Sequence, residues 1–161
     1  MACHDNCITS NSHFNVFGAF CCGNYILNCN GNAFGNFSCG NNLQQQSYSN
    51  AFEDNNNDNF INNSSSLNFG TYCSNNSLTL CSSIYFETNC SNNTLNSSYR
   101  ISFGSHSSSN TIGQHFEDST FGQSCSYNNI GNNCYNFTFG DSCLQNNIGN
   151  GNNNITFNNV C

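Results

Sequence analysis

The stretch "NNIGNNCYNFTFGDSCLQNNIGN", residues 128–150, nearly repeats itself every nine residues. Within it, Ile130, Phe139 and Ile148 stand at equal intervals, and each is followed by Gly. A fixed short period is the signature of a repeat architecture. Like residues are therefore expected at equivalent places on successive structural units.

The same period runs through the whole chain in three phases. The first phase carries Phe at steps of 17 or 18 residues: Phe17, Phe34, Phe52, Phe69, Phe86, Phe103, Phe121, Phe139 and Phe157. The second carries an aliphatic residue, which from Ile26 onward stands nine positions after the preceding phase Phe: Ile8, Ile26, Leu43, Ile61, Leu78, Leu95, Ile112, Ile130 and Ile148. The third carries Asn two positions before each aliphatic: Asn6, Asn24, Asn41, Asn59, Asn76, Asn93, Asn110, Asn128 and Asn146.

The Asn phase is the strongest of the three signals. With 38 Asn among 161 residues, composition alone would fill about two of its nine positions, and all nine are filled. The step from Phe to the next aliphatic is always nine residues, whereas the step from aliphatic to Phe is eight or nine. One half of the unit therefore has a fixed length, and the other half absorbs single-residue deletions.

A unit of this length with two similar halves predicts a β-solenoid. Helical repeats are roughly twice as long, and Asn, Ser and Gly are poor helix formers. We predict an all-β fold: one parallel β-solenoid domain over residues 1–161, either complete or part of a longer fibre, with 17–18 residues per coil and about nine coils. Each coil of this two-sided β-helix or β-roll has a strand on either side. Right-handed coiling is favoured because parallel crossovers are usually right-handed.

Alternation along a strand decides which residues face inward. Residues i and i+2 share a side, so the phase Asn and aliphatic both point inward, as do the phase Phe and the residue two before it. That last row is polar early and mostly apolar later: Asn15, Asn32, Asn50, Leu67, Ile84, Ile101, Ser119, Phe137 and Ile155. A row of Asn suits either a ligand-binding surface or a buried ladder of stacked amides. Its place beside an inward aliphatic favours the ladder.

Glycines are expected to mark the bends, because Gly adopts positive φ at little cost. They follow the phase Phe at Gly18, Gly35, Gly70, Gly104, Gly122 and Gly140, and the phase aliphatic at Gly113, Gly131 and Gly149. The absence of Pro agrees with strands that pair from coil to coil.

The chain has 13 Cys, and most of them follow the repeat. One row lies four residues after the phase Phe: Cys21, Cys73, Cys90, Cys125, Cys143 and Cys161. A second row lies on the opposite side, with Cys29, Cys81 and Cys134, and we place Tyr99 and Phe116 in equivalent positions. Stacked Cys would hold their Cβ atoms farther apart than a disulfide prefers. The spacing leaves disulfides open but favours buried thiols.

Metal and cofactor sites find little support. Cys3, His4 and Cys7, with Cys21 and Cys22, lack the paired spacing of known zinc sites. His106 and His115 are nine residues apart and are expected on opposite sides of a coil. The Gly-Gly-x-Gly-x-Asp motif of calcium-binding rolls is absent. We expect no metal and no cofactor.

Two carboxylate groups are the candidates for catalysis. Glu53, Asp54 and Asp58 lie in one coil, and Glu117 and Asp118 lie in another. Paired acids of this kind carry glycosidase chemistry. The first group also contains Asn55–Asn57 and is typical of a solvated loop, so we expect the protein not to be an enzyme.

The charge balance limits the partners. The formal net charge is −7, with Arg100 as the only Lys or Arg. Nucleic acid requires a basic surface, so it is an unexpected partner, as is an anionic membrane. Residues 1–20 show no secretory signal pattern, and no apolar run is long enough to span a bilayer. A cytoplasmic location and a virion or cell-surface location both stay open.

Outward positions offer two candidate binding features. Tyr85, Tyr127 and Tyr135 are expected to be exposed and could stack on sugars. Thr120, Thr138 and Thr156 each precede a phase Phe and form a row similar to that of insect antifreeze solenoids.

The unit "NNIGNNCYNFTFGDSC", residues 128–143, resembles the Asn/Gly/Cys-rich nonapeptide tracts in proteins of gut Bacteroidetes and their phages. The resemblance covers residues 103–161 well and the earlier part loosely. It implies a β-solenoid with a fibre or surface-binding role. The early coils depart from it, since Gln44, Glu53 and Asn62 stand where later coils have Gly.

Together these features predict a non-enzymatic structural or adhesive rod that presents an outer face to a glycan or protein. The alternatives are an ice-binding solenoid and a polysaccharide-acting β-helix enzyme. Asn6 and Ile8 are in phase near the start, and Cys161 closes the chain on a core position. We therefore expect open strand edges at both ends and self-association end to end.

Overall fold

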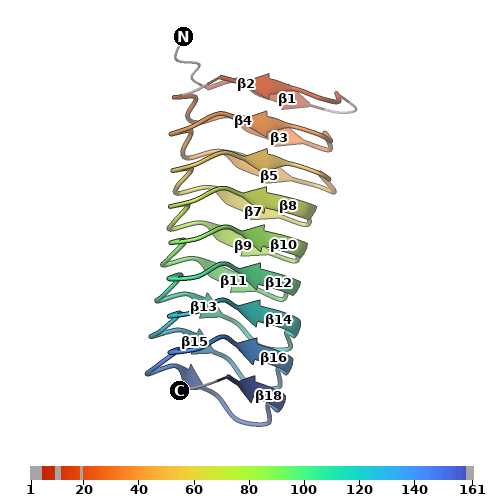
Figure 1. The fold of residues 1–161 in the computed structure, drawn as a ribbon. Coiled ribbons are helices and arrows are strands. Elements are labelled where there is room, and N and C mark those ends of the chain that lie inside the picture. Colours follow the sequence, from red (N-terminus) through yellow and green to blue (C-terminus); the bar gives the residue numbers. More distant parts are fainter. Residues whose placement is uncertain (1–4, 10–11, 19, 159–161) are drawn as a thin grey trace.

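A computed structural model of the chain confirms the β-solenoid. The structure describes residues 5–9, 12–18 and 20–158, and these contain strands and turns but no helix. Successive coils stack into a rod with the two described ends at opposite ends of the stack (Figure 1). Each coil contributes one strand to each of two parallel nine-stranded sheets.

The two sheets contain alternate strands of the chain. The first consists of the odd-numbered strands: β1 (Cys7–Thr9), β3 (Tyr25–Leu27), β5 (Asn42–Gln44), β7 (Phe60–Asn62), β9 (Ser77–Thr79), β11 (Thr94–Asn96), β13 (Thr111–Ile112), β15 (Asn129–Ile130) and β17 (Asn147–Ile148). The second consists of the even-numbered strands: β2 (Val16–Phe17), β4 (Ala33–Phe34), β6 (Ala51–Phe52), β8 (Ser65–Phe69), β10 (Ser82–Phe86), β12 (Tyr99–Phe103), β14 (Glu117–Phe121), β16 (Tyr135–Phe139) and β18 (Asn153–Phe157).

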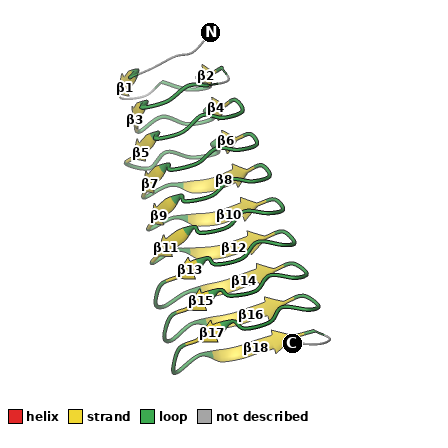
Figure 2. Ribbon diagram, turned by 90° about the vertical axis from the view of Figure 1, so that its left-hand side faces the viewer, coloured by secondary structure: helices red, strands yellow, loops and turns green. Residues whose placement is uncertain are grey.

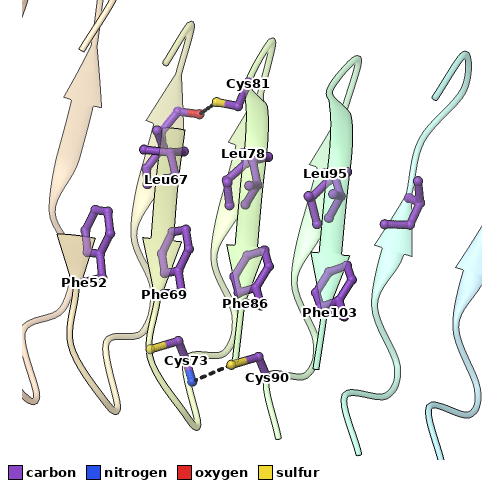
Figure 3. Close-up of a cluster of buried hydrophobic side chains, with 14 of the residues drawn as sticks. Phe52, Leu67, Phe69, Cys73, Leu78, Cys81, Phe86, Cys90, Leu95 and Phe103 are labelled. Atoms are coloured by element: carbon purple, nitrogen blue, oxygen red, sulfur yellow. Dashed lines mark hydrogen bonds between the residues drawn. The ribbon is translucent and has the colours of Figure 1, made fainter. Parts of the chain in front are cut away.

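The register between coils follows the phases of the sequence. The phase Phe residues pair with one another along the even sheet, and the phase aliphatics pair along the odd sheet. Consecutive phase rings stack with centroids 4.5 to 5.1 Å apart, from Phe17 to Phe157. Figure 3 shows Phe52, Phe69, Phe86 and Phe103 in one row, with Leu78 and Leu95 in a second. A single coil would bury little apolar surface by itself. Contacts between stacked coils therefore form the hydrophobic core.

The predicted Asn ladder is present, and its hydrogen bonds explain why the residue must be Asn. The Oδ1 of Asn93 accepts from the backbone N–H and the Nδ2 of Asn76, at 2.9 and 3.1 Å. The Nδ2 of Asn93 donates to Asn110 Oδ1 at 3.2 Å and to the carbonyl of Cys73 at 3.2 Å. Both protons and both lone pairs are therefore used. Asp has no amide protons to donate. Ser has a single O–H donor and cannot replace the two N–H donors of the Asn amide.

The inward row two residues before each Phe divides the rod into two parts. In the early coils Asn15 Nδ2 donates to Asn32 Oδ1, and Asn32 Nδ2 donates to Asn50 Oδ1, each at 2.8 Å. From Leu67 onward the row is mostly apolar: Leu67, Ile84, Ile101, Ser119, Phe137 and Ile155. The even strands lengthen at the same point, from two residues in β2, β4 and β6 to five in β8 and its successors. Figure 2 shows the short and the long arrows in the same sheet.

The predicted role of Gly at the bends is wrong in the early and the later coils alike, since Gly35 also lacks positive φ. Gly70, Gly104, Gly113, Gly122, Gly131, Gly140 and Gly149 do not have positive φ. Non-Gly residues make the bends instead, and the turn of chain around β10 has four of them: Leu80, Ser83, Asn89 and Asn92, with φ between 53° and 60°. Each is followed directly by a buried residue: Cys81, Ile84, Cys90 and Asn93. Short polar side chains such as those of Asn hydrogen-bond locally and visit this region most readily among non-Gly residues.

The later glycines are needed for close approach between coils rather than for φ. A Cβ added to Gly122 would lie 2.7 Å from the backbone N of Ser105, and one added to Gly140 would lie 2.7 Å from the carbonyl C of Gly122. Real Cβ atoms do not approach backbone so closely. Gly at these positions therefore lets successive turns stack at the strand spacing.

Candidate functional site

The interior of the rod is used for structure. The ladder residues from Asn24 to Asn128 are at most 1% exposed, so their amides are closed to a ligand. The Phe rings from Phe34 to Phe139 are also buried. A ligand can reach only the outer faces, the turns and the two ends.

The cysteine rows point inward, as the sequence predicts. Cys29, Cys73, Cys81, Cys90, Cys125 and Cys134 are fully buried, and none of these six is in a disulfide. Their sulfur atoms contact backbone groups of neighbouring coils. Cys73 N–H, for example, donates to Cys90 Sγ at 3.3 Å, as Figure 3 shows. Burial raises the pKa of Cys81 to about 11 and that of Cys125 to about 11, so both thiols are protonated at neutral pH.

The sequence-based position of Tyr99 is wrong. Ser98 occupies the inward position next to Cys81 on the following coil and is 1% exposed, whereas Tyr99 is 48% exposed. The reason is the bend at Ser97, which has positive φ and directly precedes the inward residue, as Leu80 precedes Cys81. Phe116 is fully buried in the equivalent place, as predicted.

The candidate metal ligands are not brought together in the part of the chain that the structure describes. Cys21 is buried, Cys22 beside it is partly exposed and Cys7 is exposed, while Cys3 and His4 lie outside the described residues. His106 and His115 occupy bends on either side of β13. Among the described residues, no group of three or more His, Cys, Asp or Glu side chains could share a metal ion.

One of the two carboxylate groups lines a hollow. Glu53 and Asp54 border an open hollow of about 330 Å³ together with Glu87, two coils further along. Gly70 lies on the coil between the two glutamates, and its lack of a side chain leaves the hollow open. Asp54 Oδ1 accepts from the backbone N–H of Thr71 at 2.7 Å, which gives this carboxylate a structural role. Asp58 occupies a bend and does not border the hollow.

The second carboxylate group lies on the outer face of the even sheet. Glu117 and Asp118 are both exposed in β14. Asp118 Oδ1 accepts from Asn136 Nδ2 at 2.9 Å, and Asn136 Oδ1 accepts from Asn154 Nδ2 at 3.0 Å. The outer face thus carries its own short polar ladder.

The three tyrosines proposed as ligand contacts do not share one face. Tyr85 in β10 and Tyr135 in β16 lie on the outer face of the even sheet and are 47% and 37% exposed. Tyr127 is at a bend before β15, on the way into the other sheet. Tyr99, at the start of β12, joins the outer face instead, with the guanidinium of Arg100 5.8 Å from its ring centroid.

The predicted threonine row is continuous in the structure. Ser102, Thr120, Thr138 and Thr156 pair in register along strands β12 to β18. Their side chains point away from the core, since the phase Phe next to each of them points into it. The row and the exposed tyrosines occupy the same sheet face.

Two outer columns that follow the 17- or 18-residue repeat were not predicted as groups. Glu53 and Glu87 directly follow phase Phe residues, so both belong to one column. A second column at a bend begins with Cys22 and Cys39 and continues through Asn57, Ser74, Ser91, Ser108 and Ser126. Ser74 Oγ and Ser91 Oγ each accept from the backbone N–H of the next coil, at 3.0 and 2.9 Å. The second of these columns mixes Cys, Asn and Ser, so its sequence signal is weaker than that of the inward phases.

A comparison with protein-family models finds no match, and neither does a comparison with the sequences of curated proteins. The described residues form no helix that could cross a membrane. The fold, a β-solenoid with asparagine ladders, is consistent with a structural repeat protein.

Proposed function

We propose that the chain is a non-enzymatic structural or adhesive rod that binds a glycan on the outer face of its even sheet. The observation that carries this proposal is the gathering of Tyr85, Tyr99 and Tyr135 on strands β10, β12 and β16 of one face. Tyrosine offers a flat apolar ring and a hydroxyl at low conformational cost. Both properties suit the stacking and hydrogen bonding that a sugar ring offers.

Neighbouring groups on this face support a polar, uncharged ligand. Thr120 and Thr138 supply hydroxyls on the adjacent strands, and Asn136 and Asn154 supply amides. The carboxylates of Glu117 and Asp118 and the overall charge of −7 would repel a polyanion. A neutral polysaccharide is therefore the ligand class that fits best.

A glycan array followed by titration of the strongest neutral hit tests this proposal. The double variant Tyr99→Ser/Tyr135→Ser should weaken binding about tenfold or more, because it removes two of the three aromatic rings of this face and a loss of about 1.4 kcal/mol already corresponds to tenfold in affinity. Tyr72→Ser is the matched control, since Tyr72 is 56% exposed but lies at a bend after β8. Equal affinity in the double variant, or no binding by the parent protein, would reject the glycan proposal.

Ice binding is the second candidate, and the register of Ser102, Thr120, Thr138 and Thr156 favours it. A regular row of hydroxyls at the strand spacing could order water on this face. The proposal predicts thermal hysteresis that Thr138→Tyr abolishes, because a large side chain would break the flat row. An absence of hysteresis in the parent protein rejects it.

A polysaccharide-acting enzyme is the third candidate, and we propose that the chain is not one. Asp54 is held by Thr71, and Asp58 lies at a separate bend. The purified protein should therefore hydrolyse no polysaccharide, and any trace of hydrolysis in a preparation should be the same in Asp54→Asn and Asp58→Asn. Loss of such activity in either variant would favour an enzyme.

We also propose that copies of the chain stack end to end. The ladder has a direction, because each Asn donates to the Oδ1 of the next coil. Within the described residues, no donor reaches Asn6 Oδ1, and no acceptor meets the backbone N–H of Asn146. In the part of the chain that the structure describes, one end of the ladder thus presents an acceptor and the other a donor, and Phe157, which is 42% exposed, borders the same hollow as Asn146. Sedimentation should show mass rising with concentration, and Ile148→Glu should suppress it; a strictly monomeric parent protein would contradict stacking.

A further inference from the structure

We propose that Cys22 and Cys39 form a disulfide modification site, which closes when the protein meets a low-molecular-weight disulfide such as oxidised glutathione. Their sulfur atoms are 3.9 Å apart, on successive coils. Both side chains are partly exposed. This inference concerns the covalent state of the rod and does not depend on which ligand the outer face binds.

The backbone already holds the two residues at a suitable separation. Gly23 N–H donates to the carbonyl of Cys39 at 3.2 Å, so Cys22 and Cys39 lie side by side on neighbouring turns. Strands in a sheet are spaced by about 4.8 Å, and Cα atoms joined by a disulfide are usually about 4.4–6.8 Å apart. Rotation of the two side chains, with a small closing movement of the turns that brings the Cβ atoms within about 4.5 Å, can therefore bring the sulfur atoms to bonding distance.

Access distinguishes this pair from the other stacked thiols. Cys73 and Cys90 also occupy successive coils, but both are 0% exposed. Cys73 Sγ donates to the carbonyl of Glu53 at 3.2 Å, and Cys90 Sγ donates to that of Gly70 at 3.1 Å. A soluble oxidant cannot reach these thiols while the rod is folded. Among the described residues, Cys7 is exposed but is paired in register with Tyr25 rather than with another thiol.

The reaction is thiol–disulfide exchange in two steps. The thiolate of Cys22 or Cys39 attacks one sulfur of oxidised glutathione, which releases one glutathione thiolate and leaves a mixed disulfide. The second cysteine thiolate then attacks the protein sulfur of that mixed disulfide and releases the second glutathione. In sum, two protein thiols lose two electrons and two protons, and one glutathione disulfide becomes two glutathione thiols.

The local environment sets the pH dependence of this reaction. Partial burial raises the pKa of Cys39, and the neighbouring Cys22 and the carboxylate of Asp58 raise it further. Because the thiolate is the reacting form, closure should accelerate as the pH rises above neutral. A higher pH therefore gives a faster route to the same product.

The test exposes reduced, folded protein to oxidised glutathione, alkylates the remaining thiols and digests the product with chymotrypsin. Phe34 and Phe37 offer cleavage sites between the two cysteines. We expect the intact protein to lose two hydrogen atoms and to yield one cross-linked peptide pair containing Cys22 and Cys39. Stable glutathione adducts without this cross-link, a cross-link to Cys7 or to another chain, or no reaction at all would each overturn the proposal.

A matched control comes from the column itself. Ser74, Ser91, Ser108 and Ser126 stand at the equivalent position in later coils, so Cys39→Ser should fold normally. This variant should accept glutathione on Cys22 as a stable adduct and form no internal cross-link. If it instead forms an internal disulfide, Cys22 has a different partner and the assignment is wrong.

Hydrogen exchange gives a second measurement that does not depend on peptide mapping. The disulfide closes a loop of one coil, which restricts the opened state. Amides between Cys22 and Cys39 should exchange roughly tenfold or more slowly after oxidation, by that loop-closure argument. Amides around β12 should not change, nor should any amide of Cys39→Ser. Equal exchange rates in the oxidised and reduced parent protein would contradict a disulfide that joins these two coils.

Discussion

The early and the late coils fill the same interior position in two different ways. In the early coils, Asn15, Asn32 and Asn50 form a second amide ladder, and the even strands are two residues long. In the late coils apolar residues such as Ile84 and Ile101 take this position, and the strands are five residues long. One repeat frame therefore accepts either polar or apolar filling over a run of neighbouring coils. Ser119, the polar member of the later run, donates its hydroxyl to the carbonyl of Glu117 in its own coil at 3.5 Å.

Hydrogen bonding explains why the strand length changes with the filling. The backbone N–H of Asn32 donates to the side-chain Oδ1 of Asn50 at 3.2 Å. The amide side chain therefore takes the place of a backbone partner, and regular pairing begins only at Ala33. An isoleucine cannot accept a hydrogen bond, so Ile84 pairs through its backbone with Leu67 and Ile101.

The junction between the two parts is imperfect. Asn50 Nδ2 is buried and has no hydrogen-bond partner within the described part of the chain. The next residue in its column is Leu67, which offers no acceptor. An unsatisfied buried donor costs about 1–3 kcal/mol. This position is therefore a weak point of the rod.

The largest expected effect comes from placing an isolated amide in the apolar row. Ile101→Asn should lower the free energy of unfolding by about 4 kcal/mol, because a buried aliphatic is lost and an amide without partners is gained. Leu67→Asn should cost only about 2 kcal/mol, since its Oδ1 can accept from Asn50 Nδ2. Urea denaturation of both variants measures the difference. Equal losses would show that the column does not couple neighbouring coils.

The next effect tests the polar part of the rod. Asn32→Leu should destabilise the protein by about 2 kcal/mol although it adds apolar surface, because Asn15 Nδ2 loses its acceptor. Replacing all three members, Asn15, Asn32 and Asn50, by aliphatic residues should stay within about 1 kcal/mol of the parent, since no side-chain amide is then left without a partner and the backbone can pair between coils as it does at Ile84. Denaturation of the single and triple variants decides this. A triple variant less stable than the single one would refute the account.

The smallest effect concerns the thiols of the late coils. Burial raises the pKa of Cys81 to about 11 and of Cys125 to about 11. A thiol whose pKa is raised by folding contributes its full stability below the pKa of the unfolded chain and loses it as the pH rises towards the folded value. Stability should therefore fall by roughly 1 kcal/mol per thiol between pH 8 and pH 10. In Cys81→Ser/Cys125→Ser this fall should shrink; an unchanged slope would show that other groups cause it.

The sequence predicts the fold well because the repeat leaves little freedom. Once Asn93 and Leu95 recur at fixed steps, only stacked coils place them on like neighbours, and the inward rows follow from alternation along a strand. The bends were predicted less well, since Gly122 follows Phe121 for close backbone approach and not for positive φ. Chain spacing alone does not distinguish these two uses of Gly.

The outer face is harder to predict for a related reason. Tyr99 and Ser98 are adjacent, and a bend decides which of them points inward. Cys22 and Cys39 show the same 17-residue interval as the core rows. Their residue type does not indicate whether this column faces inward or outward. Only the positions of the bends separate inward from outward columns.

The central claim is that amides of successive coils stack and satisfy one another inside the rod, and solvent exchange of side-chain amide protons tests it most directly. NMR of 15N-labelled protein transferred to D2O should show protected Nδ2 protons for Asn76, Asn93 and Asn110. The exposed outer pair, in which Asn147 Nδ2 donates to Asn129 Oδ1 at 2.9 Å, is the internal reference and should exchange at once. Equally fast exchange of the inner and outer amides would contradict the ladder.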